Sequence, residues 1–208
     1  MSNDKVEFTQ MDAMHYDVLR EICNIGAGNA TTALAKMLNV KVDMQVPKVD
    51  LVDFKNLADV VGGAETVDVG ILLMLEGNVE GMMMFILEKD TAQKMVRMLM
   101  GMPLDDLGEF SEMELSALQE VGNIITGAYL SALSDLTKMY INASIPYLAI
   151  DMVGAILSVP AIEFGKIGDK ALLIQTEFGE KDTNVNGYFI LIPTPDSYDT
   201  IFKSLGLL

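Results

Sequence analysis

The sequence has few of the residues that build disulfides or zinc sites. Its 208 residues include one cysteine, Cys23, one histidine, His15, and no tryptophan. A single cysteine cannot form an internal disulfide, and one cysteine with one histidine is too small a set for a zinc site. This composition favours a reducing, cytoplasmic compartment.

Basic residues are also scarce. Lys and Arg total 14 against 30 Asp and Glu, which gives a formal net charge of −16. A surface with that charge repels the phosphates of nucleic acids and the head groups of anionic lipids. We therefore expect neither nucleic acid nor a membrane among the partners, and we expect the charge to serve solubility or to attract a basic face of another protein.

The chain lacks a long uninterrupted hydrophobic run, although half of its residues are hydrophobic. The most apolar stretch, residues 71–87, contains Glu76 and Glu80 and falls short of the roughly 18 apolar residues that a membrane helix needs. It is typical of a hairpin. The polar, acidic residues 1–10 lack the basic start and apolar run of an export signal.

The sequence does contain an internal repeat. A Glu-x-x-Asn motif occurs twice, 99 residues apart, and in each copy 22 residues separate the asparagine from a proline. The copies are Glu21, Asn24 and Pro47, and Glu120, Asn123 and Pro146. Such spacing predicts two homologous halves, about 9–105 and 110–208, within a single domain spanning 1–208.

The repeat extends to the predicted secondary structure. Apolar residues near the helical period predict long helices at about 11–38 and 113–139, and Ser111 with Glu114 has the pattern of a capping box. Strand-like runs are 48–54, 66–75 and 79–87 in the first half and 147–152, 171–177 and 186–192 in the second. Short helices are predicted at 90–100 and 195–205, a loop at 52–63, and a partly helical segment at 151–164.

These elements predict a mixed α/β (α+β) fold built as a two-layer sandwich. We expect a pseudo-two-fold repeat of two α/β halves, with the long helices packed on antiparallel strands. Both long helices contain small residues that permit close approach of backbones, among them Gly26, Ala30, Gly122 and Ala132.

Each motif copy forms a polar row on its helix. Residues spaced by four and then three positions lie on one face of a helix. The two rows are Asp17, Glu21 and Asn24, and Ser116, Glu120 and Asn123. One such row would be an ordinary solvated face, but the return of the same Glu and Asn favours a functional role.

Glutamate and asparagine together suit positioning rather than covalent chemistry. A carboxamide both donates and accepts hydrogen bonds and can orient a water molecule, while a carboxylate can bind a cation on a partner. Phosphoryl transfer depends largely on positioning and electrostatics, so hydrolysis of a phosphoryl group is a coherent hypothesis.

Other features have structural explanations. The glycines within residues 26–31 are a weak match to a dinucleotide-binding loop, since a helical pattern precedes them and a third glycine is missing. Cys23 has no adjacent basic residue that would lower its pKa, so we expect a buried thiol. We expect His15 to be a surface or packing residue.

The doubled motif, with EICNIGAGNA at 21–30 and EVGNIITGAY at 120–129, resembles the CheC class of chemotaxis phosphatases. The resemblance implies hydrolysis of the aspartyl-phosphate of the response regulator CheY. It implies that the two asparagines position water and that the two glutamates pair with a lysine of the regulator. Asp17 and Ser116 would support them, and Pro47 and Pro146 would be structural.

The resemblance also implies partners and a cofactor. Mg²⁺ would be held by the regulator and none by this chain, the deamidase CheD would be a second partner, and the protein would act as a monomer. The alternative is a non-catalytic docking module for CheY or CheD, because flagellar switch proteins share a related architecture. The short chain favours the stand-alone enzyme.

Overall fold

The computed structural model describes residues 13–38, 43–104, 107–164, 170–179 and 185–206. The helices in this part are α1 (Ala13–Leu38), α2 (Phe54–Val61), α3 (Lys89–Leu99), α4 (Glu112–Thr137), α5 (Val153–Phe164) and α6 (Pro195–Ser204). The strands are β1 (Asp43–Asp53), β2 (Val67–Gly77), β3 (Gly81–Glu88), β4 (Ile141–Ala143), β5 (Tyr147–Met152), β6 (Lys170–Gly179) and β7 (Val185–Pro193).

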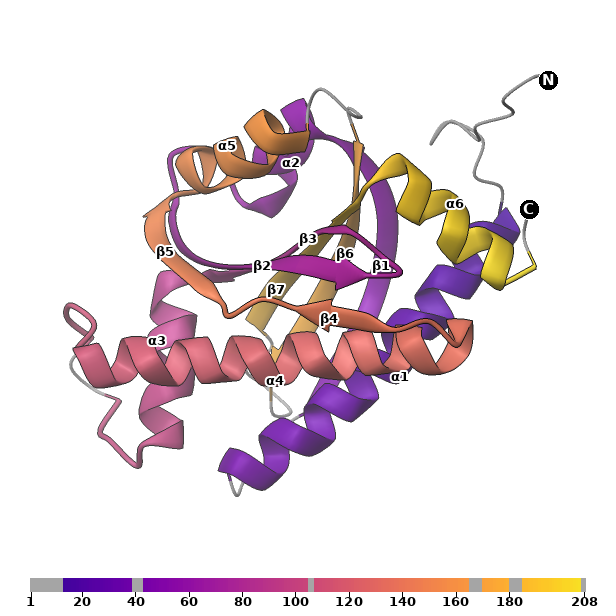
Figure 1. The fold of residues 1–208 in the computed structure, drawn as a ribbon. Coiled ribbons are helices and arrows are strands. Elements are labelled where there is room, and N and C mark those ends of the chain that lie inside the picture. Colours follow the sequence, from indigo (N-terminus) through magenta and orange to yellow (C-terminus); the bar gives the residue numbers. More distant parts are fainter. Residues whose placement is uncertain (1–12, 39–42, 105–106, 165–169, 180–184, 207–208) are drawn as a thin grey trace.

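All strand pairs of the described sheet are antiparallel. Their order is β1-β6-β7-β3-β2-β4, and β5 also pairs with β2 on the side of β4 (Figure 1). The predicted mixed α/β fold with antiparallel strands is therefore confirmed.

The pseudo-two-fold repeat is visible in the order of the elements. Helices α1 and α4 each have 26 residues and begin 99 positions apart, at Ala13 and Glu112. The strands correspond in pairs: β2 with β6, β3 with β7, and β4 and β5 together with β1. Exchanging the members of each pair gives the same strand order read from the other edge of the sheet. The axis of the repeat therefore lies between β3 and β7, at the middle of the sheet.

Helices cover both faces of the sheet. Alternate side chains of β3 enter two separate clusters, because successive residues of a strand point to opposite faces. Met83, Phe85 and Leu87 join the cluster under α1, α3, α4 and α6. The intervening residues of β3 pack with α2 and α5. Figure 1 shows these two helices on the other side of the sheet from α1 and α4. The long helices lie on the strands as predicted, and α2 and α5 add a further layer on the opposite face.

The predicted loop at 52–63 is wrong, because α2 forms there. Leu57 and Val61 lie on one side of this helix, are buried and pack in the same cluster as α5. The segment is only two turns long and ends at Gly62, so its acidic and glycine residues obscured an amphipathic pattern. Helices α2 and α5 begin 99 positions apart, which extends the repeat.

Close approach of α1 to α4 depends on a glycine. A Cβ atom at Gly26 would lie 2.7 Å from Cδ1 and 3.0 Å from Cα of Tyr129. A Cβ atom at Gly122 would likewise lie 2.6 Å from Cγ2 of Ile71, so α4 is closely seated on β2. No helix in the described ranges has the length and apolar character of a membrane-spanning segment.

Candidate functional site

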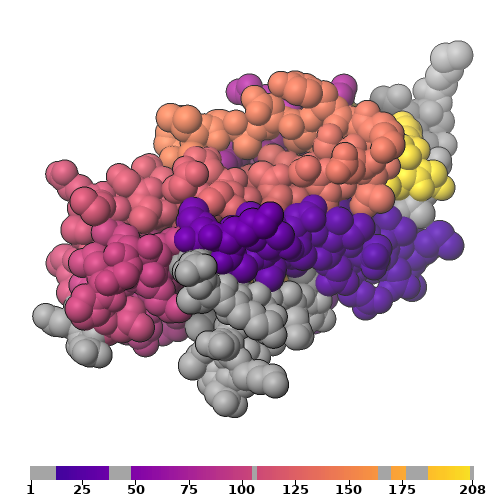
Figure 2. Space-filling model, turned by 90° about the horizontal axis from the view of Figure 1, so that it is seen from below, coloured from indigo at the N-terminus to yellow at the C-terminus, as the bar shows by residue number. Residues whose placement is uncertain are grey.

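Helices α1 and α4 lie side by side on one face of the molecule, α1 in indigo and α4 in pink to orange (Figure 2). All six residues of the two polar rows are exposed on these helices. Residues between them, such as Ile22 and Cys23 in α1 and Val121 and Gly122 in α4, are buried. The helical period thus separates a solvent-facing polar row from a core-facing side in both halves.

The first row contains an ion pair within its own helix. Arg20 Nη2 donates to Asp17 Oδ1 at 2.6 Å, and both side chains are exposed. An exposed pair of this kind contributes little to stability. Its effect is local, since it holds the guanidinium of Arg20 against Asp17 in the polar row.

The second row has a different neighbour at the equivalent position. Gln119, 99 residues after Arg20, donates from Nε2 to the carbonyl oxygen of Pro146 at 3.4 Å. This bond connects α4, next to Glu120, to the segment that precedes β5. The two sites therefore share the motif but differ in charge beside the glutamate.

The two motif prolines lie at interruptions of the outer strands. Pro47 lies in β1 where the register with β6 shifts between Gln45 and Lys48, and Pro146 lies between β4 and β5. Proline lacks an N–H group and is tolerated at sheet edges and bulges. Strand β1 begins at Asp43, ahead of Pro47, so this proline lies within the strand and does not mark its start.

The start of α4 is fixed by a carboxylate that accepts three hydrogen bonds. The Glu114 carboxylate accepts from the backbone N–H of Ser111 at 2.7 Å, from its hydroxyl at 2.8 Å, and from Arg97 Nε of α3 at 2.8 Å. The Ser111 N–H and the Arg97 guanidinium lower the pKa of Glu114 to about 2. The predicted capping box is confirmed, and it anchors the helix that carries Asn123.

Neither the cysteine nor the histidine supplies a catalytic group on this face. Cys23 is 4% exposed, and burial raises the pKa of its thiol to about 12, so the predicted buried thiol is confirmed. The His15 ring packs against Phe202 with centroids 5.0 Å apart. Within the described ranges, no three His, Cys, Asp or Glu side chains are placed to hold a metal ion.

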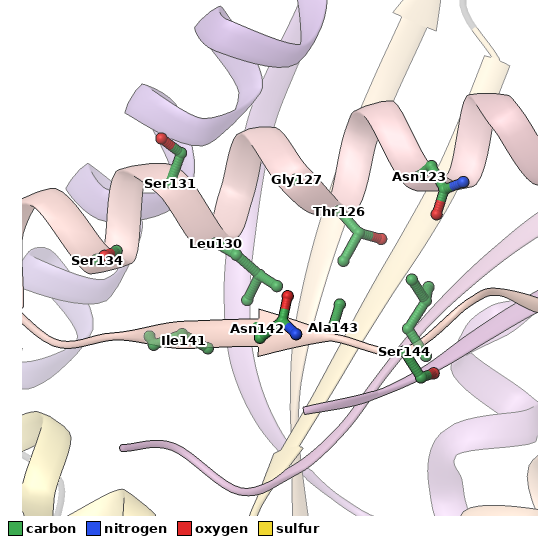
Figure 3. Close-up of a pocket in the computed structure, with 11 residues that line it drawn as sticks. Asn123, Thr126, Gly127, Leu130, Ser131, Ser134, Ile141, Asn142, Ala143 and Ser144 are labelled. Atoms are coloured by element: carbon green, nitrogen blue, oxygen red, sulfur yellow. The ribbon is translucent and has the colours of Figure 1, made fainter. Parts of the chain in front are cut away.

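A cavity of about 370 Å³ opens beside Asn123, between α4 and β4 (Figure 3). It is lined by Leu73, Asn123, Thr126, Gly127, Leu130, Ser131, Ser134, Ile141, Asn142, Ala143 and Ser144. No sequence pattern predicts this cavity. The sequence feature that corresponds to its wall is the series of small and hydroxyl residues that follows Asn123 along one side of the helix.

The arrangement can orient water and bind a cationic group on a partner. Exposed carboxamides supply donors and acceptors, and exposed carboxylates supply negative charge. The side chains are presented on the outer side of two neighbouring helices.

Several known proteins are similar to this chain. Residues 14–50 match the CheC-like family, and residues 69–160 match the family described as chemotaxis phosphatase CheX. The CheY-P phosphatase CheC of Bacillus subtilis (strain 168) is 39% identical over 195 residues, covering 91% of this chain and 93% of that protein.

Solved structures share the fold. The crystal structure of Thermotoga maritima FliY superposes with a TM-score of 0.77 at 22% identity and covers 95% of this chain and 98% of that one. The FliM middle domain from H. pylori gives a TM-score of 0.67 at 13% identity, covering 93% and 99%.

Proposed function

The chain belongs to the CheC family of chemotaxis phosphatases, and we propose that it hydrolyses the aspartyl-phosphate of a CheY-type response regulator. The observation that carries this proposal is the exposure of two Glu-x-x-Asn pairs on neighbouring rigid helices. The relative from Bacillus subtilis is named a CheY-P phosphatase, which supports the same substrate.

In this proposal each asparagine acts on water. The carboxamide of Asn24 or Asn123 enters the regulator's site and holds a water molecule in line with the phosphorus atom. The water oxygen bonds to phosphorus, the bond from phosphorus to the aspartyl oxygen breaks, and the water protons leave with inorganic phosphate and solvent. The regulator regains a free aspartate.

Each glutamate fixes the complex. Glu21 or Glu120 pairs with a lysine of the regulator and so sets the position of the asparagine one turn along the helix. Mg²⁺ belongs to the regulator, where it offsets the charge of the phosphoryl group. Asp17 and Ser116 support their rows from one turn before the glutamate. Asp17 does so by binding Arg20.

Both sites are competent in this proposal, and they differ in the residue that precedes the glutamate. In the first site Arg20, the residue before Glu21 in the sequence, is paired with Asp17. The second site carries the neutral Gln119 at that place. Binding of CheD and a monomeric state remain predictions from the family resemblance.

The test is a dephosphorylation assay. A phosphorylated CheY-type receiver domain with Mg²⁺ is mixed with the wild type, Asn24→Ala, Asn123→Ala or the double variant, and loss of phosphate is followed. We expect a partial loss of activity in each single variant and none left in the double variant. Asn29→Ala is the matched control, since Asn29 is exposed on α1 and is not one of the Glu-x-x-Asn residues.

Two outcomes contradict the proposal. If the receiver binds the wild type but its decay is not accelerated, the non-catalytic docking module takes the place of the enzyme. If the double variant keeps full activity, hydrolysis occurs elsewhere on the molecule.

A further inference from the structure

We propose that the cavity between α4 and β4 is a second contact site for the regulator, which receives a short uncharged peptide segment next to the phosphorylated aspartate. This inference rests on the proposed function and concerns the second site alone. Asn123 lines the cavity, so a partner that brings its phosphoryl group to Asn123 also reaches the cavity mouth (Figure 3).

The lining is polar but carries no charge. None of the residues that line the cavity is acidic or basic, and its volume of about 370 Å³ falls within the range of ligand sites. A phosphate or a metal ion would find no counter-charge there. Hydroxyl and amide groups together with the apolar Leu73 and Ile141 suit peptide groups and small uncharged side chains.

Thr126 supplies a hydroxyl group that lacks a partner. Its side chain is 1% exposed, and within the described part of the chain its Oγ1 atom makes no hydrogen bond. Figure 3 shows Thr126 on the side of α4 that faces β4, one turn from Asn123. A buried hydroxyl is normally paired, so a residue left unpaired at the wall of a cavity points to a ligand group that pairs with it.

Other polar groups of the cavity divide into two kinds. The Ser134 hydroxyl donates to the carbonyl of Met139, and the Ser144 hydroxyl accepts from the Met74 N–H, so both maintain the fold. Ser131 and Asn142 are exposed, and their side chains line the cavity. They are available to a ligand together with Thr126.

The position of β4 favours a peptide as the occupant. Among the described strands it stands last in the sheet order and pairs on one side only, with β2, so its outer edge carries backbone groups that a short extended segment can bind. Backbone pairing at β4 and hydrogen bonds from the side chains of α4 would hold the same segment from two sides.

The first half does not repeat this set of side chains. Thr126 corresponds to Ala27, which has no hydroxyl, and Ser131 corresponds to Thr32, whose hydroxyl donates to the Gly28 carbonyl at 2.9 Å. In the sequence Asn142 corresponds to the acidic Asp43. The contact is therefore specific to the site of Asn123.

Two variants test the inference in an Asn24→Ala background, where only the second site works. Thr126→Val keeps the shape and removes the hydroxyl. Gly127→Leu places a side chain in the cavity, and a Cβ atom at Gly127 meets nothing within 4 Å. Gly28→Leu is the matched control, because Gly28 lies 99 residues earlier in α1 and also has open space around it.

Affinity is measured by calorimetry with a beryllofluoride-activated receiver domain, and turnover is measured with the phosphorylated receiver. We expect Thr126→Val and Gly127→Leu to raise Kd and KM about five-fold or more, with kcat and Tm retained. The control should leave Kd and KM unchanged.

An unchanged Kd in both Thr126→Val and Gly127→Leu would overturn the inference while leaving the proposed function intact. Binding that depends on the cavity, with no acceleration of hydrolysis by the wild type, would refute the proposed function and keep the contact site.

Discussion

Phe85 and Phe189 stack at the centre of the sheet, with ring centroids 4.4 Å apart and ring planes 18° apart. They are direct partners in the register of β3 and β7, on the two strands that the pseudo-symmetry exchanges. The repeat axis thus passes between two phenylalanines, one from each half. Tyr129 of α4 packs on Phe189 with centroids 4.5 Å apart, and Gly26 of α1 lies against Tyr129. One continuous set of contacts therefore joins both site helices.

Loss of the central ring should destabilise both halves together. Phe189→Ala removes a fully buried ring, and we expect the free energy of unfolding to fall by about 3–5 kcal/mol in a single transition. Urea denaturation measures it, and Tyr140→Ala, at a 70% exposed ring, serves as control. Two separate transitions would show that the halves do not share a core.

Spacing between α1 and α4 should be sensitive to one methyl group. Gly26→Ala pushes against the backbone and ring of Tyr129, so we expect a loss of about 1–3 kcal/mol in stability and lower phosphatase activity. The matched Gly28→Ala has open space and should gain about 0.5–1 kcal/mol, because alanine favours a helix. Thermal unfolding of both variants decides the matter, and equal Tm values would contradict close packing at Gly26.

The motif glutamates should affect binding more than turnover. We expect Glu120→Gln in the Asn24→Ala background to raise KM about ten-fold and to reduce its dependence on salt, with kcat nearly unchanged. Steady-state assays at low and high ionic strength measure this, with the exposed Glu65→Gln as control. A loss confined to kcat would instead place Glu120 in the chemical step.

Protonation of Glu114 should lower the free energy of unfolding in acid. Its pKa falls from 4.5 to about 2 in the folded state, so its contribution is full above about pH 4.5 and is lost as pH falls toward 2. Glu114→Gln should remove that dependence and lower stability at pH 7 by about 2 kcal/mol, since the carboxylate loses charged hydrogen bonds. Unfolding measured from pH 2 to 7 tests this. Glu112→Gln, exposed in the same turn, should behave like the wild type.

Asp68 should have the opposite effect on the pH dependence of stability. Burial, with the nearby Glu88, raises the pKa of this carboxyl from 3.8 to about 6, so its ionisation lowers stability as pH rises from about 4 to 6. We expect Asp68→Asn to be about 1–2 kcal/mol more stable than the wild type at pH 7.5 and equal to it below pH 4. Thermal melts at the two pH values measure the difference. The exposed Asp59→Asn control should show none, and a destabilised Asp68→Asn at pH 7.5 would contradict the assignment.

Much of the fold could be predicted from residues that signal local structure. Ser111 and Glu114 mark the start of α4, and the constant offset of 99 residues relates α1 to α4. Helix α2 was missed because two turns contain too few apolar positions to separate a helix from a loop, and its burial depends on α5. The beginning of β1 was missed because its pairing with β6 is decided by residues more than 120 positions away.

The candidate site, like the fold, could be predicted from the sequence only in part. Exposure of Asn24 and Asn123 follows from the helical period, which the sequence displays directly. The cavity beside Asn123 depends on α4, β2 and β4 meeting, and its floor includes Leu73, about 50 positions from the motif. No local pattern reports such a meeting, so the cavity became visible only in three dimensions.

The interruptions at Pro47 and Pro146 hinder strand pairing between the edges of this sheet and the sheet of another molecule. A long, flat rim would invite the rim of a second molecule and begin a fibre, whereas a rim broken by proline cannot be continued by strand after strand. Strand β4 has three residues, so only a short peptide segment can pair with its outer edge. Because the proline recurs with the repeat, both edges of the sheet are interrupted in the same way.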